Sequence, residues 1–230
     1  MTRVSRKKRL FLSVALSAIG LLAVTGAALA ENYQYRFTSA DQTLAARILL
    51  NPSNVPKGWT GGSVKPDLSP DPLRCPGYYA PKESDLVVTG AKETDFTYKN
   101  SQELDTYSTV FQSPAMAETD WHRSNNVPSF FKCLRAKWAT LPAGKGSKII
   151  SLALLSLPRF GTHSLAYRVV FETSASRQRI AVDSVLIARG RYEVEIDQIA
   201  QSPSTRDLAN MMAGDRYIAR ALDAKLLSTH

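Results

Sequence analysis

Histidine is the residue type in this chain best suited to acid–base chemistry or metal binding, and the chain contains three: His122, His163 and His230. Catalysis by a histidine needs a nucleophile within hydrogen-bonding reach, and a metal site needs further ligands at suitable spacing. No two of these histidines have metal-ligand spacing, and neither a Ser-His-Asp nor a Cys-His arrangement has local support. The sequence therefore predicts no catalytic residue, no metal site and no cofactor, and each histidine is interpreted as a lone surface or half-buried side chain.

Carboxylates gather at one place, where Glu193, Glu195 and Asp197 occupy alternate positions. Alternation places all three on one face of a strand, and the apolar residues between them indicate a sheet with one solvated face. Such an acidic face could bind a cation weakly. Ion pairs with nearby arginines such as Arg168 and Arg191 are the favoured interpretation.

A phosphate-binding loop is incomplete in this sequence, and a nucleophile elbow is absent from it. The run from Gly144 to Ser147 superficially resembles a phosphate-binding loop, but the earlier glycine and the preceding strand are missing. It is interpreted as a helix-to-strand turn. No Gly-x-Ser-x-Gly nucleophile elbow occurs.

The chain has two cysteines, Cys75 and Cys133. In an exported protein such a pair predicts one disulfide, and the long loop that it closes implies about 4 kcal/mol of stabilisation. The alternative is a pair of free thiols. Their spacing is not that of a Cys-x-x-Cys redox motif, so the structural bridge is favoured.

The first thirty residues have the three parts of a secretory signal. Five basic residues lie within residues 3–9, an apolar stretch covers 10–24, and a small-residue tail ends at Ala28-Leu29-Ala30. We expect cleavage after Ala30 and a secreted or extracytoplasmic protein. The alternative is a retained anchor, but the apolar stretch is short against the ~20 residues that a span needs. No later segment is apolar enough, so we expect no stable membrane span after processing.

The charge of the chain changes once this segment is set aside. The formal net charge is +9, but five of the 29 basic residues and none of the 20 acidic ones lie in residues 1–30, which leaves +4 on the remainder. That balance does not indicate a nucleic-acid partner. Residues 123–191 hold twelve Lys or Arg against Glu172 and Asp183, a bias that could attract an anionic envelope polymer or acidic lipid. The alternative is that these charges face different ways.

Residues 31–230 fit a single globular domain. A helix is predicted from Thr38 or Ser39 to about residue 51, and residues 51–84, rich in Pro and Gly, are predicted to be irregular with Trp59 as an anchor in the core. Strands are predicted at 86–90, 95–99, 103–112, 149–157, 164–172, 180–188 and 192–199, and helices at 113–123, 129–138 and 204–226. Gly214 is expected to bend or split the last helix.

This order of elements predicts an α+β fold. Strands that follow one another by hairpins favour a curved antiparallel sheet, and the helical blocks would pack on one of its faces. Trp121, His122 and Trp138 lie on the two central helices, so we expect a ligand cleft between these helices and the sheet.

Several segments together resemble a known group. They are the loop from Leu50 to Trp59, Cys75 in its proline-rich stretch, the run from Val110 to Ala117, and Phe131-Lys132-Cys133-Leu134. The chain resembles uncharacterised exported actinobacterial proteins that are similar in plan to PknH-type extracytoplasmic sensor domains and to PsbP-like lipoproteins such as LpqN. The resemblance implies a Cys75–Cys133 bridge and a binding role outside the cytoplasm. It supplies no catalytic residue, and this chain lacks the kinase domain and the lipidated cysteine.

The favoured function is therefore an exported, non-enzymatic binding or sensor-like domain of the cell envelope or the outside of the cell, with an unknown envelope ligand. One alternative is a secreted hydrolase with a non-local active site that uses His163 or His122 as its base. The other is an envelope scaffold or assembly protein, which predicts a large exposed apolar patch.

Overall fold

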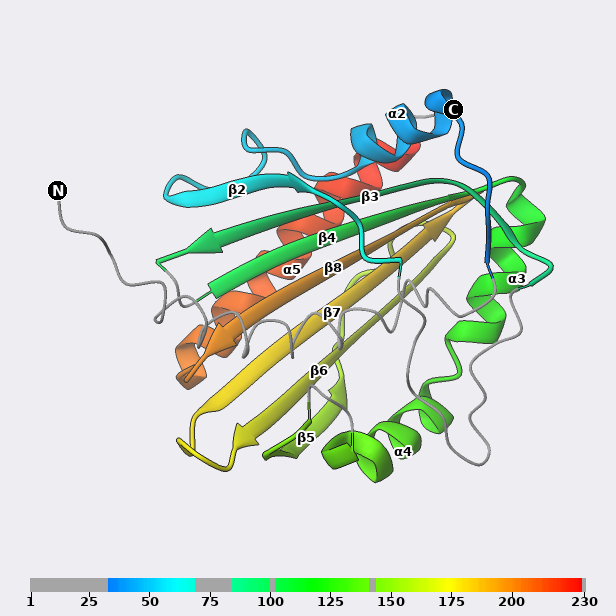
Figure 1. The fold of residues 1–230 in the computed structure, drawn as a ribbon. Helices are drawn as coiled ribbons and strands as arrows, with labels where there is room; N and C mark the ends of the chain where they lie inside the picture. The colour runs from blue at the N-terminus through cyan, green and yellow to red at the C-terminus, as the bar shows by residue number, and fades with distance from the viewer. Residues whose placement is uncertain (1–32, 69–83, 100–101, 141–143, 229–230) are drawn as a thin grey trace, which may run out of the picture.

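The computed structural model describes residues 33–68, 84–99, 102–140 and 144–228. The predicted signal (1–30), Cys75 and His230 lie outside these ranges. The described residues form one eight-stranded sheet and four α-helices, arranged as an α+β fold (Figure 1). In chain order the elements are β1 (Gln34–Tyr35), α2 (Ser39–Ile48), β2 (Trp59–Val64), β3 (Val87–Tyr98), β4 (Gln102–Phe111), α3 (Pro114–Ser124), α4 (Val127–Lys137), a 3-10 turn η2 (Trp138–Thr140), β5 (Ser147–Leu154), β6 (His163–Thr173), β7 (Arg179–Arg189), β8 (Tyr192–Gln201) and α5 (Thr205–Leu227).

Three of the four predicted helix starts are confirmed, and the fourth is wrong, because α4 begins at Val127 instead of Ser129 and has no side-chain cap. The Thr38 side chain accepts a hydrogen bond from the Asp41 amide at 3.1 Å, which caps α2. Ser204 and Asp207 form both bonds of a capping box at the start of α5. The expected break at Gly214 is wrong, because α5 continues through that residue. The strands predicted at 86–90 and 95–99 are parts of one strand, β3.

Part of the segment that was predicted to be irregular forms β2. This strand pairs antiparallel with β3, with Gly61 opposite Phe96. The glycine has φ +145°, and a Cβ there would lie 2.0 Å from the Asp95 carbonyl oxygen, so only glycine allows this approach. The predicted anchor Trp59 is half-buried and packs with its ring 5.7 Å from that of Tyr98. The glycines that suggested irregular structure thus permit a strand.

The sheet has the order β1-β3-β4-β8-β7-β6-β5, with β2 also paired to β3. Every pairing is antiparallel except β1 with β3, where Gln34 lies opposite Val87 in parallel. The wholly antiparallel sheet of the prediction is therefore corrected at this edge. The chain leaves β1 through α2 and β2 instead of a tight hairpin, so it re-enters β3 in the same direction.

Helices cover both faces of the sheet, so the prediction that they pack on one face is wrong. Val185 and Ile187 of β7 lie in a core cluster with α2 and α5, and Figure 1 shows α5 behind the sheet. Leu186 and Ala188, which alternate with them, lie in a second cluster with α3 and α4. Because successive strand residues point to opposite faces, these clusters lie on opposite sides of one sheet. Helices α3 and α4 connect β4 with β5, whereas α2 follows β1 and α5 follows β8.

The acidic face of β8 is buried, so the prediction of a solvated face is also wrong. Glu193, Glu195 and Asp197 are only 7, 2 and 3 % exposed. Glu195 lies opposite Leu186, on the side of the sheet that faces α3 and α4. Alternation alone could not show this, because it identifies two faces without showing what covers each.

The arginines proposed as partners of these carboxylates pair elsewhere. Arg168 hydrogen-bonds Asp183 of β7 through two nitrogens, and it also donates to the Leu208 carbonyl of α5 at 2.9 Å. Arg191 donates to both carboxylate oxygens of Asp41 at 2.9 and 2.5 Å, which ties the turn between β7 and β8 to α2. Both pairs lie on the face of the sheet opposite Glu193, Glu195 and Asp197 or at its edge, so the predicted ion pairs are wrong.

A row of three aspartates crosses the sheet instead. Asp95, Asp105 and Asp197 lie directly opposite one another on β3, β4 and β8, and Ser184 of β7 continues the row and donates to Asp197 at 2.5 Å. Burial raises the pKa of Asp197 to about 7, and burial together with Asp95 raises that of Glu103 to about 7. Burial and Asp95 also raise the pKa of Asp105 well above its usual range. Like charges opposed in a sheet favour protonation of some of these groups.

Cys133 lies on α4 with 2 % exposure, inside the core that α4 forms with β5–β7. Because Cys75 is outside the described ranges, the disulfide stays a prediction. Among the residues that the structure describes, no helix combines the length and the apolar character that crossing a bilayer requires.

The raised pKa of Asp197 predicts a pH-dependent stability. A carboxyl whose pKa is higher in the folded than in the unfolded state stabilises the fold while it is protonated, and this contribution is lost as the pH rises from about 4 to about 7. For a shift of this size the linkage is up to about 4 kcal/mol. We expect the melting temperature to fall between pH 5 and pH 8, by roughly 2–4 °C per kcal/mol. Asp197→Asn, which keeps an acceptor for Ser184, should flatten the slope; equal slopes in both proteins would contradict the assignment.

Candidate functional site

Helix α3 presents the residues of the candidate site. Ser113 caps it by accepting from the Met116 amide at 3.3 Å, and Pro114 occupies its first turn, as predicted. Glu118 and His122 follow one turn apart on its exposed side, and Glu118 Oε1 lies 2.9 Å from His122 Nε2. Trp121 lies between them in sequence and is 9 % exposed.

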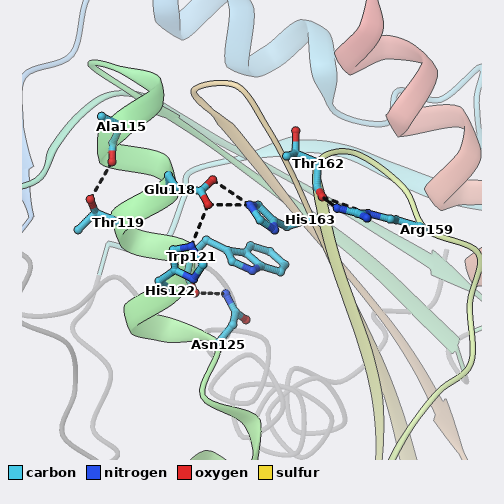
Figure 2. Close-up of polar contacts among 9 residues, drawn as sticks. All are labelled: Ala115, Glu118, Thr119, Trp121, His122, Asn125, Arg159, Thr162 and His163. Carbon is cyan, nitrogen blue, oxygen red and sulfur yellow. Dashed lines mark hydrogen bonds and ion pairs between the residues drawn. The ribbon is translucent and has the colours of Figure 1, made fainter.

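The third polar group of the site comes from β6. His163, its first residue, places Nε2 2.8 and 3.0 Å from the two carboxylate oxygens of Glu118 (Figure 2). Its ring stacks on Trp121 with centroids 5.4 Å apart and 18° between the planes, and it meets His122 edge-on at 5.8 Å. One carboxylate thus joins two imidazoles from elements 45 residues apart along the chain.

This cluster, Glu118–His122–His163 over Trp121, borders a surface pocket of about 320 Å³. Glu118, His163 and Thr162 give the pocket a polar side. Arg189 borders it as well and pairs with Asp223 of α5 at 2.9 Å. The whole lining is Pro114, Ala115, Ala117, Glu118, Thr162, His163, Ala188, Arg189 and Gly190.

The electrostatics of the cluster keep its carboxylate charged. The hydrogen bond to His163, and more weakly that to His122, holds the pKa of Glu118 below its usual range. Glu118 therefore stays ionised at neutral pH and remains an acceptor for both rings. An ionised carboxylate beside two imidazoles offers a ligand both donors and acceptors.

Within the described residues, the cluster contains neither a nucleophile bonded to a histidine nor a set of metal ligands. Across the described ranges, neither His122 nor His163 hydrogen-bonds a Ser, Thr or Cys side chain. In the same ranges, no group of three or more His, Cys, Asp or Glu is placed to hold a metal ion.

The structure brings two of the three predicted cleft residues together. Trp121 and His122 belong to the cluster without lining the pocket itself, and Trp138 belongs to neither. Trp138 is 2 % exposed, its indole Nε1 donates to Ser147 Oγ at 2.9 Å, and its ring packs 5.1 Å from Phe171. It belongs to the core between α4 and β5–β7.

Sequence analysis missed Glu118 altogether and did not connect His163 with Trp121. The Glu-x-x-x-His spacing of Glu118 and His122 on a predicted helix was the available signal, because residues four apart share a helix face. No comparable signal existed for His163. Its position depends on how β6 lies against α3.

No protein-family model matches the chain, and no curated protein matches its sequence. Solved structures that are similar to it include the following two. The extracellular domain of PknH from Mycobacterium tuberculosis has 9% sequence identity and a TM-score of 0.46, covering 78% of this chain and 95% of that one. The Rv0999 ortholog from Mycobacterium smegmatis, an uncharacterised protein, has 11% identity and a TM-score of 0.47, covering 82% and 97%.

The first of these proteins is of the PknH type that the sequence motifs resemble. The resemblance to PsbP-like lipoproteins stays a prediction. Similarity at this level assigns neither an activity nor a ligand to this chain, so the function has to be argued from the site.

If the cluster serves recognition, the fold should depend on it little. Glu118 has 48% of its side chain exposed, so we expect Glu118→Ala to lower the free energy of unfolding by less than about 1 kcal/mol. Trp121→Ala removes a buried ring and should cost about 3–5 kcal/mol. Urea denaturation measures both. A loss of several kcal/mol in Glu118→Ala would show that the cluster is structural.

Proposed function

We propose that this chain is an exported, non-enzymatic binding domain whose ligand occupies the pocket beside α3. The observation that carries the proposal is Glu118, which lines an open pocket together with His163 and also binds His122 beside it, with no nucleophile bonded to either ring in the described residues. The pocket joins an apolar wall of Pro and Ala side chains to a polar side. This combination suits a small ligand with one apolar face and several hydroxyl or amine groups.

Binding is tested by thermal shift with a panel of cell-wall fragments and lipids. A ligand present at a hundred times its dissociation constant adds about 2.7 kcal/mol, which corresponds to a rise of several degrees. We expect Glu118→Gln and His163→Ala to lose this rise while they stay folded. Arg220→Ala, an exposed change on α5, serves as the control and should keep it. A folded wild-type protein that responds to no class would overturn the proposal.

Export and the disulfide form a second part of the proposal. The signal layout of residues 1–30 supports export, and export in turn favours a Cys75–Cys133 bridge. Cys133 is deeply buried on α4, where a bridge would tie that helix to the proline-rich segment that contains Cys75.

Mass spectrometry of protein recovered from outside the cytoplasm checks both points. We expect the chain to begin at Glu31 and to weigh two hydrogen atoms less than its reduced form. Recovery of an intact chain in the cytoplasm with two alkylatable thiols would refute export and the bridge together.

A secreted hydrolase is the alternative function, and one contact favours it. An imidazole oriented by a carboxylate, as in His163 with Glu118, is the base half of a catalytic arrangement. If screening finds an esterase, peptidase or glycosidase activity, its survival in the His122→Ala/His163→Ala variant would remove this alternative. The scaffold hypothesis also stays a prediction.

A further inference from the structure

The outer edge of the sheet carries an unusual charge. Residues 121–171 contain eight Lys or Arg and no Asp or Glu. Helix α4 and strand β5 lie within this stretch, and β5 is the last strand of the sheet. Four of the basic residues are exposed on α4, on β5 or in the connection between them: Lys132, Arg135, Lys145 and Lys148. Together with the exposed Ile150 and Leu154 they are called the basic edge.

Two hydrogen bonds hold these residues on one side of the molecule. Arg135 of α4 donates to the Leu152 carbonyl of β5 at 3.2 Å, which places it at the free edge of that strand. Trp138, directly after α4, donates to Ser147 at the start of β5 at 2.9 Å. Figure 1 shows α4 beside β5 at this end of the sheet. Lys145 and Lys148 flank Ser147, so the helix and the strand bring their charges together.

The positive charge of the basic edge is largely uncompensated. Within the described part of the chain, no ion pair joins Lys132, Arg135 or Lys145 to a carboxylate. Lys148 approaches Glu172 at 3.6 Å with 63% of its side chain exposed, an arrangement that solvent screens strongly. An anionic partner would therefore meet a surface whose cations are free to bind it.

Apolar side chains lie among these charges. Ile150 is 42% exposed and Leu154 60%, on either side of Leu152, whose carbonyl Arg135 binds. An anionic polymer needs cations alone, whereas a membrane surface takes cations at its phosphates and aliphatic groups at its interface. We propose that the basic edge docks on a membrane surface rich in anionic phospholipid. This surface is distinct from the α3 pocket and does not depend on the ligand bound there.

A second copy of the chain is a poorer occupant. The free edge of β5 could pair with another β5, but lysines on an edge strand repel a second copy. Arg135 also donates a hydrogen bond to the Leu152 carbonyl, which is one of the acceptors that pairing of two β5 strands would use. Dimerisation is therefore an outcome to be tested against membrane binding.

Vesicle sedimentation tests the proposal, with every variant purified in the same processed form as the wild type. Vesicles of phosphatidylglycerol mixed with phosphatidylcholine are compared with phosphatidylcholine alone, and with soluble polyglycerol phosphate as an anion without a bilayer. We expect binding to the anionic vesicles only, weakening as salt rises. Lys132→Glu/Lys145→Glu should reduce it at least about tenfold. Ile150→Ser/Leu154→Ser should reduce vesicle binding and leave any binding of the polymer unchanged.

The matched control is Arg206→Glu/Arg220→Glu, which makes the same change of net charge at exposed positions of α5. It should bind vesicles nearly as the wild type does, and melting curves establish that all variants fold. Equal losses in both charge-reversed pairs would overturn the proposal, because net charge alone would then explain binding. Binding of the polymer that equals binding of the vesicles, or dimers that disappear in the Ile150→Ser/Leu154→Ser variant, would overturn it as well.

Discussion

The fold depends on the coverage of its central strands from both sides. Strands β7 and β8 are buried at almost every position, with α2 and α5 on one face and α3 and α4 towards the other. A strand in this position has no solvent-facing residues, so any polar side chain on it needs a partner or must give up its charge. Arg168 and Asp183 meet this requirement as an ion pair within the α5 face. The aspartates of the opposite face meet it with raised pKa values.

The same requirement explains how α3 is held. Asp120 is fully buried on this helix and accepts a hydrogen bond from Tyr33, while Arg123 makes two hydrogen bonds to Asp85 at 2.8 and 3.0 Å. Burial raises the pKa of Asp120 to about 6. These contacts hold α3 in place. Glu118 lies on the exposed side of the helix, where it does not contribute to the core.

The pocket and the basic edge divide the helical block between two tasks. Helix α3 places Glu118, and β6 places His163, at a recess, a geometry for a small ligand. Helix α4 places its cations along a sheet edge, a geometry for an extended anionic surface. The turn at Asn125 and Asn126 separates the two helices, so the two proposals assign partners of different size to consecutive helices. Part of the run without acidic residues thus forms this edge, whereas Arg123, Arg159 and Arg168 of the same run lie on α3, in a loop and on β6.

The sequence alone determined most of the helices and strands, because caps, prolines and alternation are local properties that act within a few residues. It predicted the α+β class and the helix starts at Thr38, Ser113 and Ser204. It could not determine which side of β8 meets solvent or that His163 would reach Glu118. Those features depend on which surfaces the helices cover and on contacts between residues far apart along the chain. Only the tertiary structure decides them, since a strand's pattern distinguishes two faces without specifying what packs against either.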